Sequence, residues 1–483
     1  MNRKLFLLIC VIVAFLGGCT LAPQYNRPAS PVSADWPTGA AYQEVKTGAI
    51  IAPLASDVSW REFFTDDRLR KVIETSLRNN RDLRIAASNV ERARAYYGIQ
   101  KAGLLPTLNA VGSGVKKRVP ADLSMTSQRM TSEQYEVILG ISSWEIDFFG
   151  RIRSLKDKAL EEYLATGEAH RSAQIALVSA AAHAYLALAA DREALGLVTS
   201  TLETREAAYQ LIRKRVDVGI ASEMDLRQAQ TQVDTARGDV ARYMQLAAED
   251  ENMLNLLAGD SLPPALLPSH LADVTPPREF SPGLSSELLL CRPDVVAMEH
   301  QLKAANANIG AARAAFFPRI SLTTAIGTAS AELSGLFKSG QRTWSFAPQI
   351  ALPIFDARTW SAYDVTKVEK EMAVAHYEKA IQTAFREVAD ALALRGTVNQ
   401  RIAAQQSLVE AVAETHRLSN ARYTKGIDSY LGVLDAQRSL YGAQQQLIAL
   451  HYARLANLVT LYTVLGGGSH CKQVVQAAHG NGK

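Results

Sequence analysis

Histidine, cysteine and acidic side chains are the residues of this 483-residue chain that could do chemistry, and their spacing argues against an enzyme. A zinc hydrolase would need paired histidines such as HExxH, and a serine hydrolase would need a GxSxG turn. Neither motif occurs, and there is no Gly-rich phosphate-binding loop. The histidines are scattered: His170, His183, His270, His300, His376, His416, His451, His470 and His479. We therefore expect no catalytic residue, no metal site and no cofactor.

One cysteine near the N-terminus does have the setting of a modification site. Arg3 and Lys4 are followed by the apolar run LFLLICVIVAFL, which is too short for a transmembrane helix. The run ends in LGGC, which resembles a bacterial lipoprotein cleavage box. We expect residues 1–18 to be a signal peptide and Cys19 to carry lipid such as palmitate, which anchors a chain without spanning the membrane. The alternative is an ordinary secretory signal with a chance cysteine.

The residue after Cys19, the other cysteines and the net charge indicate the compartment and the class of partner. Thr20 follows the cysteine, whereas Asp there would resemble an inner-membrane retention signal, so the outer membrane is favoured. Cys291 and Cys471 show no metal or redox spacing, and we expect no disulfide between them because Cys471 lies near the chain end. The formal charge of +4 is small and no basic stripe stands out, which argues against binding to nucleic acid.

The chain contains an internal duplication. Residues 81–109 align with residues 293–321 without a gap, so that Asp82 matches Asp294 and Pro106 matches Pro318. After each of these prolines the hydrophobic pattern changes from the helical period to alternation. The alternation predicts a strand hairpin in each half, with strands at about 106–119, 134–148, 318–330 and 342–355.

The alternating residues define one apolar face. It comprises Tyr135, Val137, Leu139 and Ile141 in the first half, and Trp344, Phe346, Ile350 and Leu352 in the second. The strands have transmembrane length, and aromatic residues gather at their ends as in an interfacial girdle, so we expect this face to meet lipid. The alternative is the edge of a water-soluble β-sandwich, which must then explain why only two hairpins occur among so much helix.

Each hairpin is followed by a long helical segment without proline, from about Arg151 to Val218 and from about Ala357 to Lys425. About 68 helical residues make a rod of ~100 Å. A shorter helix returns after each rod, so the same helical corner appears twice. The glycines supply the turns and the serines the N-caps of the returning helices: Gly219, Gly426, Ser222 and Ser429.

Four strands cannot close a membrane barrel, because the smallest single-chain barrel has ~8 strands. Open strand edges are not tolerated in lipid. We therefore expect several chains to pool their strands in one transmembrane β-barrel that continues into a tube of coiled-coil helical hairpins, in a protein that is mainly α.

Motifs in a fixed order across most of the chain carry a family resemblance: LGGCTLAPQYNRP, WREFFTDDRLRKVI, LLPTLN, SWEIDFFGRIR, CRPDVVAMEHQLKAAN, AAFFPRISL, LPIFDARTW and ARYTKGIDSYLGVLDAQRSLYGAQQQLI. The sequence resembles the outer membrane factor family, that is, outer membrane efflux lipoproteins of the TolC/OprM type. The resemblance implies a homotrimer with a twelve-stranded β-barrel in outer membrane lipid and a large periplasmic α-barrel. Cys291 departs from the family pattern, which usually has a second basic residue before RPD.

The resemblance also implies a function and a gate. Such proteins are passive exit ducts of tripartite efflux systems, with a periplasmic adaptor (membrane fusion) protein and an inner-membrane pump, here of the RND type. The periplasmic constriction would fall at Leu431 and Asp435, with Arg422, Tyr423 and Asp428 as gate-locking contacts across the tip. The alternative is that Asp435 is a solvated acid and Leu431 packs between helices.

These expectations divide the chain into a signal peptide, an extended lipidated segment, two structural repeats and a flexible tail: 1–18, 19–60, 61–275, 276–467 and 468–483. Drugs or other small toxic solutes are the favoured cargo, because the eight methionines form no cluster of the kind expected for metal export. Metal efflux and type I secretion stay open. A trimeric stalk or adhesin is the alternative of another class, although the loops at 119–133 and 330–342 are short for one.

Overall fold

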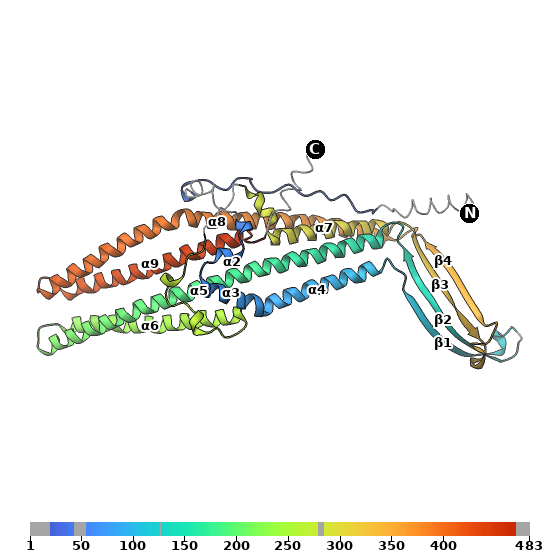
Figure 1. Ribbon diagram of the computed structural model, residues 1–483, viewed down its shortest axis with the longest axis horizontal. Helices are drawn as coiled ribbons and strands as arrows, with labels where there is room; N and C mark the ends of the chain where they lie inside the picture. The colour runs from blue at the N-terminus through green and yellow to red at the C-terminus, as the bar shows by residue number, and fades with distance from the viewer. Residues whose placement is uncertain (1–19, 43–54, 126, 279–284, 470–483) are drawn as a thin grey trace. The chain divides into compact units, whose positions relative to one another are not determined.

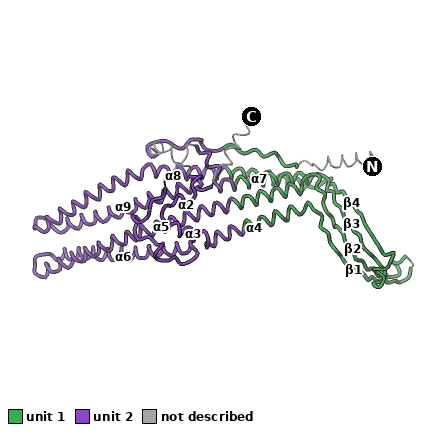
Figure 2. The backbone as a smooth tube through the Cα atoms, viewed as in Figure 1, with its two compact units in different colours: residues 1–29, 89–167, 297–377 green, residues 30–88, 168–296, 378–483 purple. Residues whose placement is uncertain are grey.

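The computed structural model of the protein describes residues 20–42, 55–125, 127–278 and 285–469. The chain forms two compact units (Figure 2). Unit 1 comprises residues 1–29, 89–167 and 297–377, and unit 2 comprises residues 30–88, 168–296 and 378–483. Each unit therefore draws segments from both sequence repeats, so the compact units cut across the repeat boundaries.

Unit 1 contains a four-stranded antiparallel sheet in the order β1-β2-β3-β4 (Figure 1). The strands are β1 (Leu108–Val119), β2 (Met130–Ile146), β3 (Arg319–Ser330) and β4 (Arg342–Ala351). The hairpin of the first repeat joins that of the second through pairing of β2 with β3. β2 begins four residues earlier than the sequence pattern suggests, because Met130 to Glu133 continue the ladder with β1.

A β-bulge interrupts the alternation near the end of β2. The register shifts between Ile141 and Trp144, and Ser143 adopts a left-handed φ of 51°. A bulge adds one residue to a strand, so it reverses which side chains point to each face beyond it. Trp144 consequently joins the face of Ile141, which strict alternation does not predict.

Helices precede and follow each strand pair. α4 (Arg81–Ala102) and α7 (Pro293–Ala314) lead into β1 and β3, and α5 (Arg151–Asp217) and α8 (Ala357–Thr424) follow β2 and β4. The returning helices are α6 (Glu223–Ala258) and α9 (Tyr430–Val464). The two long helices α5 and α8 each end within one residue of the end predicted from the sequence, and both predicted returning helices are present. Short elements complete the description: α2 (Trp60–Phe63), α3 (Asp67–Asn79), and 3-10 turns at Ala55–Asp57, Ala121–Leu123, Pro264–Leu266, Leu271–Asp273, Ser286–Cys291 and Leu333–Gly335.

Two of these helices contain stretches apolar enough to cross a membrane. The stretches in α5 and α9 have mean hydropathies of 1.5 and 1.2. In α5, 56% of the stretch is buried inside the protein, as in a core helix of a water-soluble domain. Length and composition alone therefore do not make α5 a membrane helix.

Unit 2 has an aromatic core where short helices meet the end of α9. Phe63 stacks on Tyr462 with ring centroids 4.1 Å apart, and Phe64 meets the same ring edge-on. The Tyr462 hydroxyl donates to the carbonyl of Val58 at 2.8 Å, so this buried polar group is satisfied. α3 is held in place by Asp66, whose carboxylate accepts from two backbone N–H groups of its first turn.

In unit 1 the N-terminal segment is extended, as predicted, but it is packed along α7. Asn306 donates to the carbonyl of Pro23 at 2.7 Å, and Arg27 forms an ion pair with the buried Glu299 at 2.7 Å. Gly310 permits this approach, because a Cβ there would lie 2.7 Å from the backbone nitrogen of Ala22. The sequence does not reveal this packing, because the contacts are made by residues far apart in the chain.

In unit 2 the continuation of this segment is also packed. Trp36 is 7% exposed and stacks on Phe385 at 5.3 Å. Ser286 donates through its hydroxyl to the carbonyl of Ser33 at 2.5 Å. Cys291 is disulfide-bonded, and the other three cysteines of the sequence, Cys471 among them, lie outside the described residues.

Candidate functional site

The strand residues predicted to meet lipid lie on one face of the sheet. The register aligns Leu139 with Ile326 and Trp344 in one row across β2, β3 and β4. Other rows place Tyr135, Val137, Ile141, Phe346 and Ile350 on this face, together with Trp144. Trp344, Phe346 and Ile350 are 74%, 62% and 69% exposed. Leu352 follows the last residue of β4 and is half exposed.

The opposite face of the sheet is polar. A row across β2, β3 and β4 consists of Glu145, Ser321 and Gln349. Farther along, Ser113 of β1 donates to the carboxylate of Glu136 of β2 at 2.9 Å. Strands β2, β3 and β4 therefore carry a mainly apolar and a mainly polar side, which suits a wall between two different solvents, whereas β1 places Lys116 and Arg118 on the apolar side.

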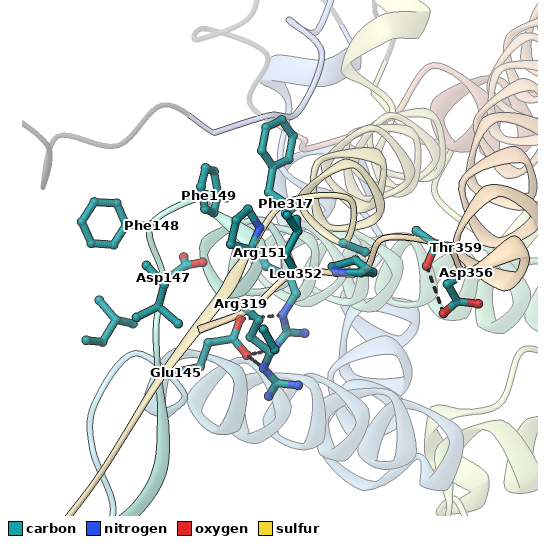
Figure 3. A pocket seen from close by; sticks show the side chains of 17 residues that line it. Glu145, Asp147, Phe148, Phe149, Arg151, Phe317, Arg319, Leu352, Asp356 and Thr359 are labelled. Atoms are coloured by element: carbon teal, nitrogen blue, oxygen red, sulfur yellow. Dashed lines mark hydrogen bonds and ion pairs between the residues drawn. The ribbon is translucent and has the colours of Figure 1, made fainter. Parts of the chain in front are cut away.

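A cleft of about 480 Å³ lies where the strands end and the helices begin (Figure 3). Its apolar wall includes Phe149 and Phe317, which stack at 4.8 Å. Its charged wall is built on Glu145, whose carboxylate accepts two hydrogen bonds from Arg151 at 2.8 Å each and pairs with Arg319 at 2.6 Å. The three residues come from β2, α5 and β3, so they fasten both hairpins to the first turn of a helix.

The start of α5 at this cleft is fixed by Asp147. Its carboxylate accepts from the backbone N–H groups of Ile152 and Arg153 at 3.0 and 2.8 Å, which satisfies donors that a helix N-terminus leaves unpaired. Gly150 directly precedes α5 and has a φ of 74°, which turns the chain sharply into the helix. A positive φ of this size favours glycine, so the motif DFFGRIR encodes the strand-to-helix corner.

The two helical corners share one backbone geometry. Gly219 and Gly426 have φ values of 76° and 74°. In the first corner the N–H of Ile220 bonds to the carbonyl of Arg215 at 2.8 Å, and in the second the N–H of Ile427 bonds to the carbonyl of Arg422 at 3.0 Å. Bonds of this span, with glycine in the left-handed region, are the Schellman helix ending.

The serines that follow occupy the N-cap positions but act differently. Ser222 accepts from the N–H of Asp225 and completes a capping box, in which Asp225 accepts from the N–H of Ser222. Ser429 is the N-cap of α9 without a side-chain bond to the helix. The third residue of α9 is Gly432, which has no carboxylate to complete the box.

The predicted locking residues make contacts of two kinds. Arg422 pairs with Asp428 at 2.5 Å, which closes its own corner and does not reach the other hairpin. Tyr423 does reach the other hairpin, because the guanidinium of Arg215 on α5 lies 5.2 Å from the centre of its ring. An apolar cluster joins the same two corners and includes Ile212 of α5 and Tyr430 of α9.

Leu431 and Asp435 both face solvent in the single chain. Leu431 is 58% exposed, and the Asp435 side chain is 65% exposed. With Leu434 and Arg438, and with Gln228, Thr231 and Gln232 of α6, they line a cleft of about 170 Å³. Arg438 pairs with Asp435 at 2.6 Å, so the carboxylate has a cation beside it within the same chain.

Sequence reasoning missed Arg438, Arg215 and the Glu145 cluster. Arg438 is signalled by its place three residues after Asp435, where helical residues are neighbours. Arg319 has no local signal, because its partner is distant in sequence. Within the ranges that the structure describes, no group of three or more His, Cys, Asp or Glu side chains is placed to hold a metal ion.

The predicted lipidation site, Cys19, lies outside the described residues. The neighbouring Thr20 is described, and its hydroxyl lies 3.3 Å from that of the buried Ser154 in the first turn of α5. The chain therefore enters the described structure at the end of unit 1 where the strands meet the helices.

Comparison with known proteins gives one consistent result. The family model for outer membrane efflux proteins matches residues 72–260 and 284–467. The toluene efflux pump outer membrane protein TtgC and the antibiotic efflux pump outer membrane protein ArpC, both from Pseudomonas putida, are each 47% identical to this chain over 466 residues, covering 96% of both proteins. The structure is also similar to the open state of the Neisseria gonorrhoeae outer membrane channel MtrE, with a TM-score of 0.82, 37% identity and coverage of 93% of this chain and 98% of that one.

Proposed function

Since this chain belongs to the outer membrane efflux protein family, a family of channel proteins, it is an outer membrane efflux channel, and we propose that it works as a homotrimeric exit duct coupled to a periplasmic adaptor and an inner-membrane pump of the RND type. The observation that carries the proposal is the four-stranded sheet, in which strands β2 to β4 have one apolar, exposed face and one polar face.

Trimerisation follows from the edges of that sheet. β1 and β4 are its outer strands, and each offers a row of backbone groups that lipid cannot satisfy. Four strands are too few to close on themselves, whereas three chains supply twelve. The exposed apolar face then meets lipid, and the polar face with Glu145 and Gln349 lines the lumen.

The helical corners are the proposed periplasmic end. Val218, Ile220 and Ile427 are large apolar side chains exposed at these tips. Exposed apolar groups on a water-facing surface favour a protein partner, which supports docking of the adaptor there. Tyr423 with Arg215 would hold the two hairpins of one chain together in the resting state.

Leu431 and Asp435 are proposed to form the constriction. They lie four residues apart on α9 and on one side of it, and threefold symmetry turns each into a ring. An apolar ring resists wetting and a carboxylate ring disfavours anions. Arg438 offsets part of the Asp435 charge, so the leucine ring carries more of the barrier than the sequence alone suggests.

Lipid on Cys19 is proposed as an auxiliary anchor. Its neighbour Thr20 lies beside the first turn of α5, close to the ends of the strands that we place in the membrane. An acyl chain leaving the protein there would need only a short path to the inner leaflet of the outer membrane.

Apolar toxic solutes and antibiotics are the proposed cargo. The relatives named for toluene and antibiotic efflux support this class, and the scattered methionines do not favour metal ions. Metal efflux and type I secretion are the alternative cargoes. Deletion of the gene should lower survival in toluene and tolerance of antibiotics, with unchanged tolerance of copper and silver; the reverse pattern would contradict the assignment.

The duct itself is tested by native mass spectrometry and planar-bilayer recording on the purified protein. We expect a trimer that conducts ions, with a higher conductance when the gate residues Leu431 and Asp435 are truncated. A trimeric stalk or adhesin would insert without conducting in either form, which separates the two classes.

A further inference from the structure

The charged group at the end of the sheet includes Glu145 of the polar face, and its arginines have no role in the wall or the gate described above. Glu145 lies in β2, Arg319 begins β3 and Arg151 begins α5, and all three line the cleft in Figure 3. Arg151 donates two hydrogen bonds to the Glu145 carboxylate, and Arg319 forms an ion pair with the same carboxylate at 2.6 Å. Two guanidinium groups share one carboxylate, so the group carries a net positive charge.

The side chains of this charged group differ in the fraction that is exposed to solvent. The Glu145 side chain is 10% exposed, whereas that of Arg319 is 62% exposed. The carboxylate is thus enclosed by its partners, and the charge that reaches solvent is that of arginine. Coulomb attraction and repulsion act on a passing ion mainly through such exposed charge.

Nearby carboxylates do not reverse this sign. Asp147 is also enclosed, and it is bonded to the first turn of α5 and to the guanidinium of Arg153. Asp356 pairs with Arg358 at 3.1 Å, and it is again the arginine that is the more exposed partner. In each of these ion pairs around the cleft, therefore, the arginine is more exposed than the acid.

The register places Arg319 on the polar face of the sheet. It is two residues before Ser321, which pairs with Gln349 of β4 and Glu145 of β2. Farther along this face Lys117 and Glu136 carry opposite charges. Only the end of the sheet at the helices therefore has an excess of one sign.

We propose that Arg319, held by Glu145, forms a cationic collar in the duct and gives it a preference for anionic solutes at the junction of strands and helices. The collar rests on the proposed function, because threefold symmetry and a lumen on the polar face turn one arginine into a ring of three. Rings of like charge set the ion preference of many channels.

The size of the effect follows from screened electrostatics. An ion about 10 Å from each of three charges feels a potential that, at ~0.1 M salt, changes the anion-to-cation permeability ratio about three- to five-fold. At ~1 M salt, where the screening length is ~3 Å, the preference should vanish.

The test is the reversal potential of the purified trimer in a planar bilayer, measured in a threefold KCl gradient near 0.1 M. Arg319→Gln should shift the permeability ratio about three- to five-fold toward K⁺, while Arg319→Lys should keep the wild-type value. Glu145→Gln should shift it toward Cl⁻, in the opposite direction. Arg342→Gln is the matched control, because Arg342 lies on the apolar face of β4.

The measurements distinguish a failure of the proposed collar from a failure of the proposed duct. Equal reversal potentials for wild type and Arg319→Gln, in conducting trimers of normal yield, would overturn the collar and leave the duct intact. A shift in Arg319→Lys as large as in Arg319→Gln would overturn the charge argument. A trimer that does not conduct even in the variant with Leu431→Ala and Asp435→Ala would overturn the duct and the collar together.

Discussion

A pair of carboxyl groups in unit 2 makes a specific prediction about pH. Asp191 on α5 and Asp250 on α6 lie close enough for each carboxyl group to affect the pKa of the other. Burial and the repulsion between two neighbouring carboxylates both favour the protonated form of such a group. Burial, followed by the charge of Asp191, raises the pKa of Asp250 to about 6, and one of its oxygens is buried without a partner.

The sign of the effect follows from linkage. The folded protein holds the Asp250 proton more tightly than the unfolded chain, whose ordinary value is 3.8. The contribution to stability is therefore complete below about pH 4 and is lost as pH rises toward about 6. A shift of this size corresponds to about 3 kcal/mol without screening. Because the side chain is only partly buried, we expect about 1–2 kcal/mol per chain.

The perturbation is Asp250→Asn, which keeps a donor for Asp191 but does not titrate. Its free energy of unfolding should match wild type near pH 4.5 and exceed it by about 1–2 kcal/mol at pH 7.5. Denaturant unfolding of the detergent-solubilised protein at both pH values measures the difference. Glu203→Gln, on an exposed site of α5, is the matched control and should leave the pH dependence unchanged. A variant Asp250→Asn with the pH dependence of wild type would refute the raised pKa of Asp250.

Three further predictions concern the membrane and the gate. Ile350→Arg should cost about 2–4 kcal/mol of barrel stability if that side chain faces the lipid midplane, whereas Gln349→Arg should be tolerated. The amount of heat-resistant trimer on gels measures both effects. Equal amounts for the two variants would mean that the faces are assigned wrongly. Leu431→Ala with Asp435→Ala should raise the resting conductance in bilayers and admit large antibiotics to cells, and wild-type conductance at normal trimer yield would remove these residues from the gate. Cys19→Ala behind a cleavable signal should still insert and trimerise, as membrane fractionation would reveal, and failure to insert would contradict an auxiliary anchor.

Local sequence patterns predict much of this architecture. The duplication, the strand alternation and the absence of proline from the rods each depend on residues close together in the chain. Gly219 and Gly426 could be identified as corners because a left-handed φ at a helix end favours glycine wherever it occurs. Such signals need no knowledge of the rest of the fold.

The tertiary structure decided what depends on distant residues. The sequence could not reveal the bulge that moves Trp144 to the face of Ile141, because alternation is judged against a partner strand. Nor could it pair Arg319 with Glu145, since the second repeat must first lie beside the first. Nor could it show that Trp36 is packed, because its partner Phe385 lies far away in sequence, on α8 of the second repeat. Periodicity specifies which elements form, whereas long-range packing and charge pairing specify which side chains meet.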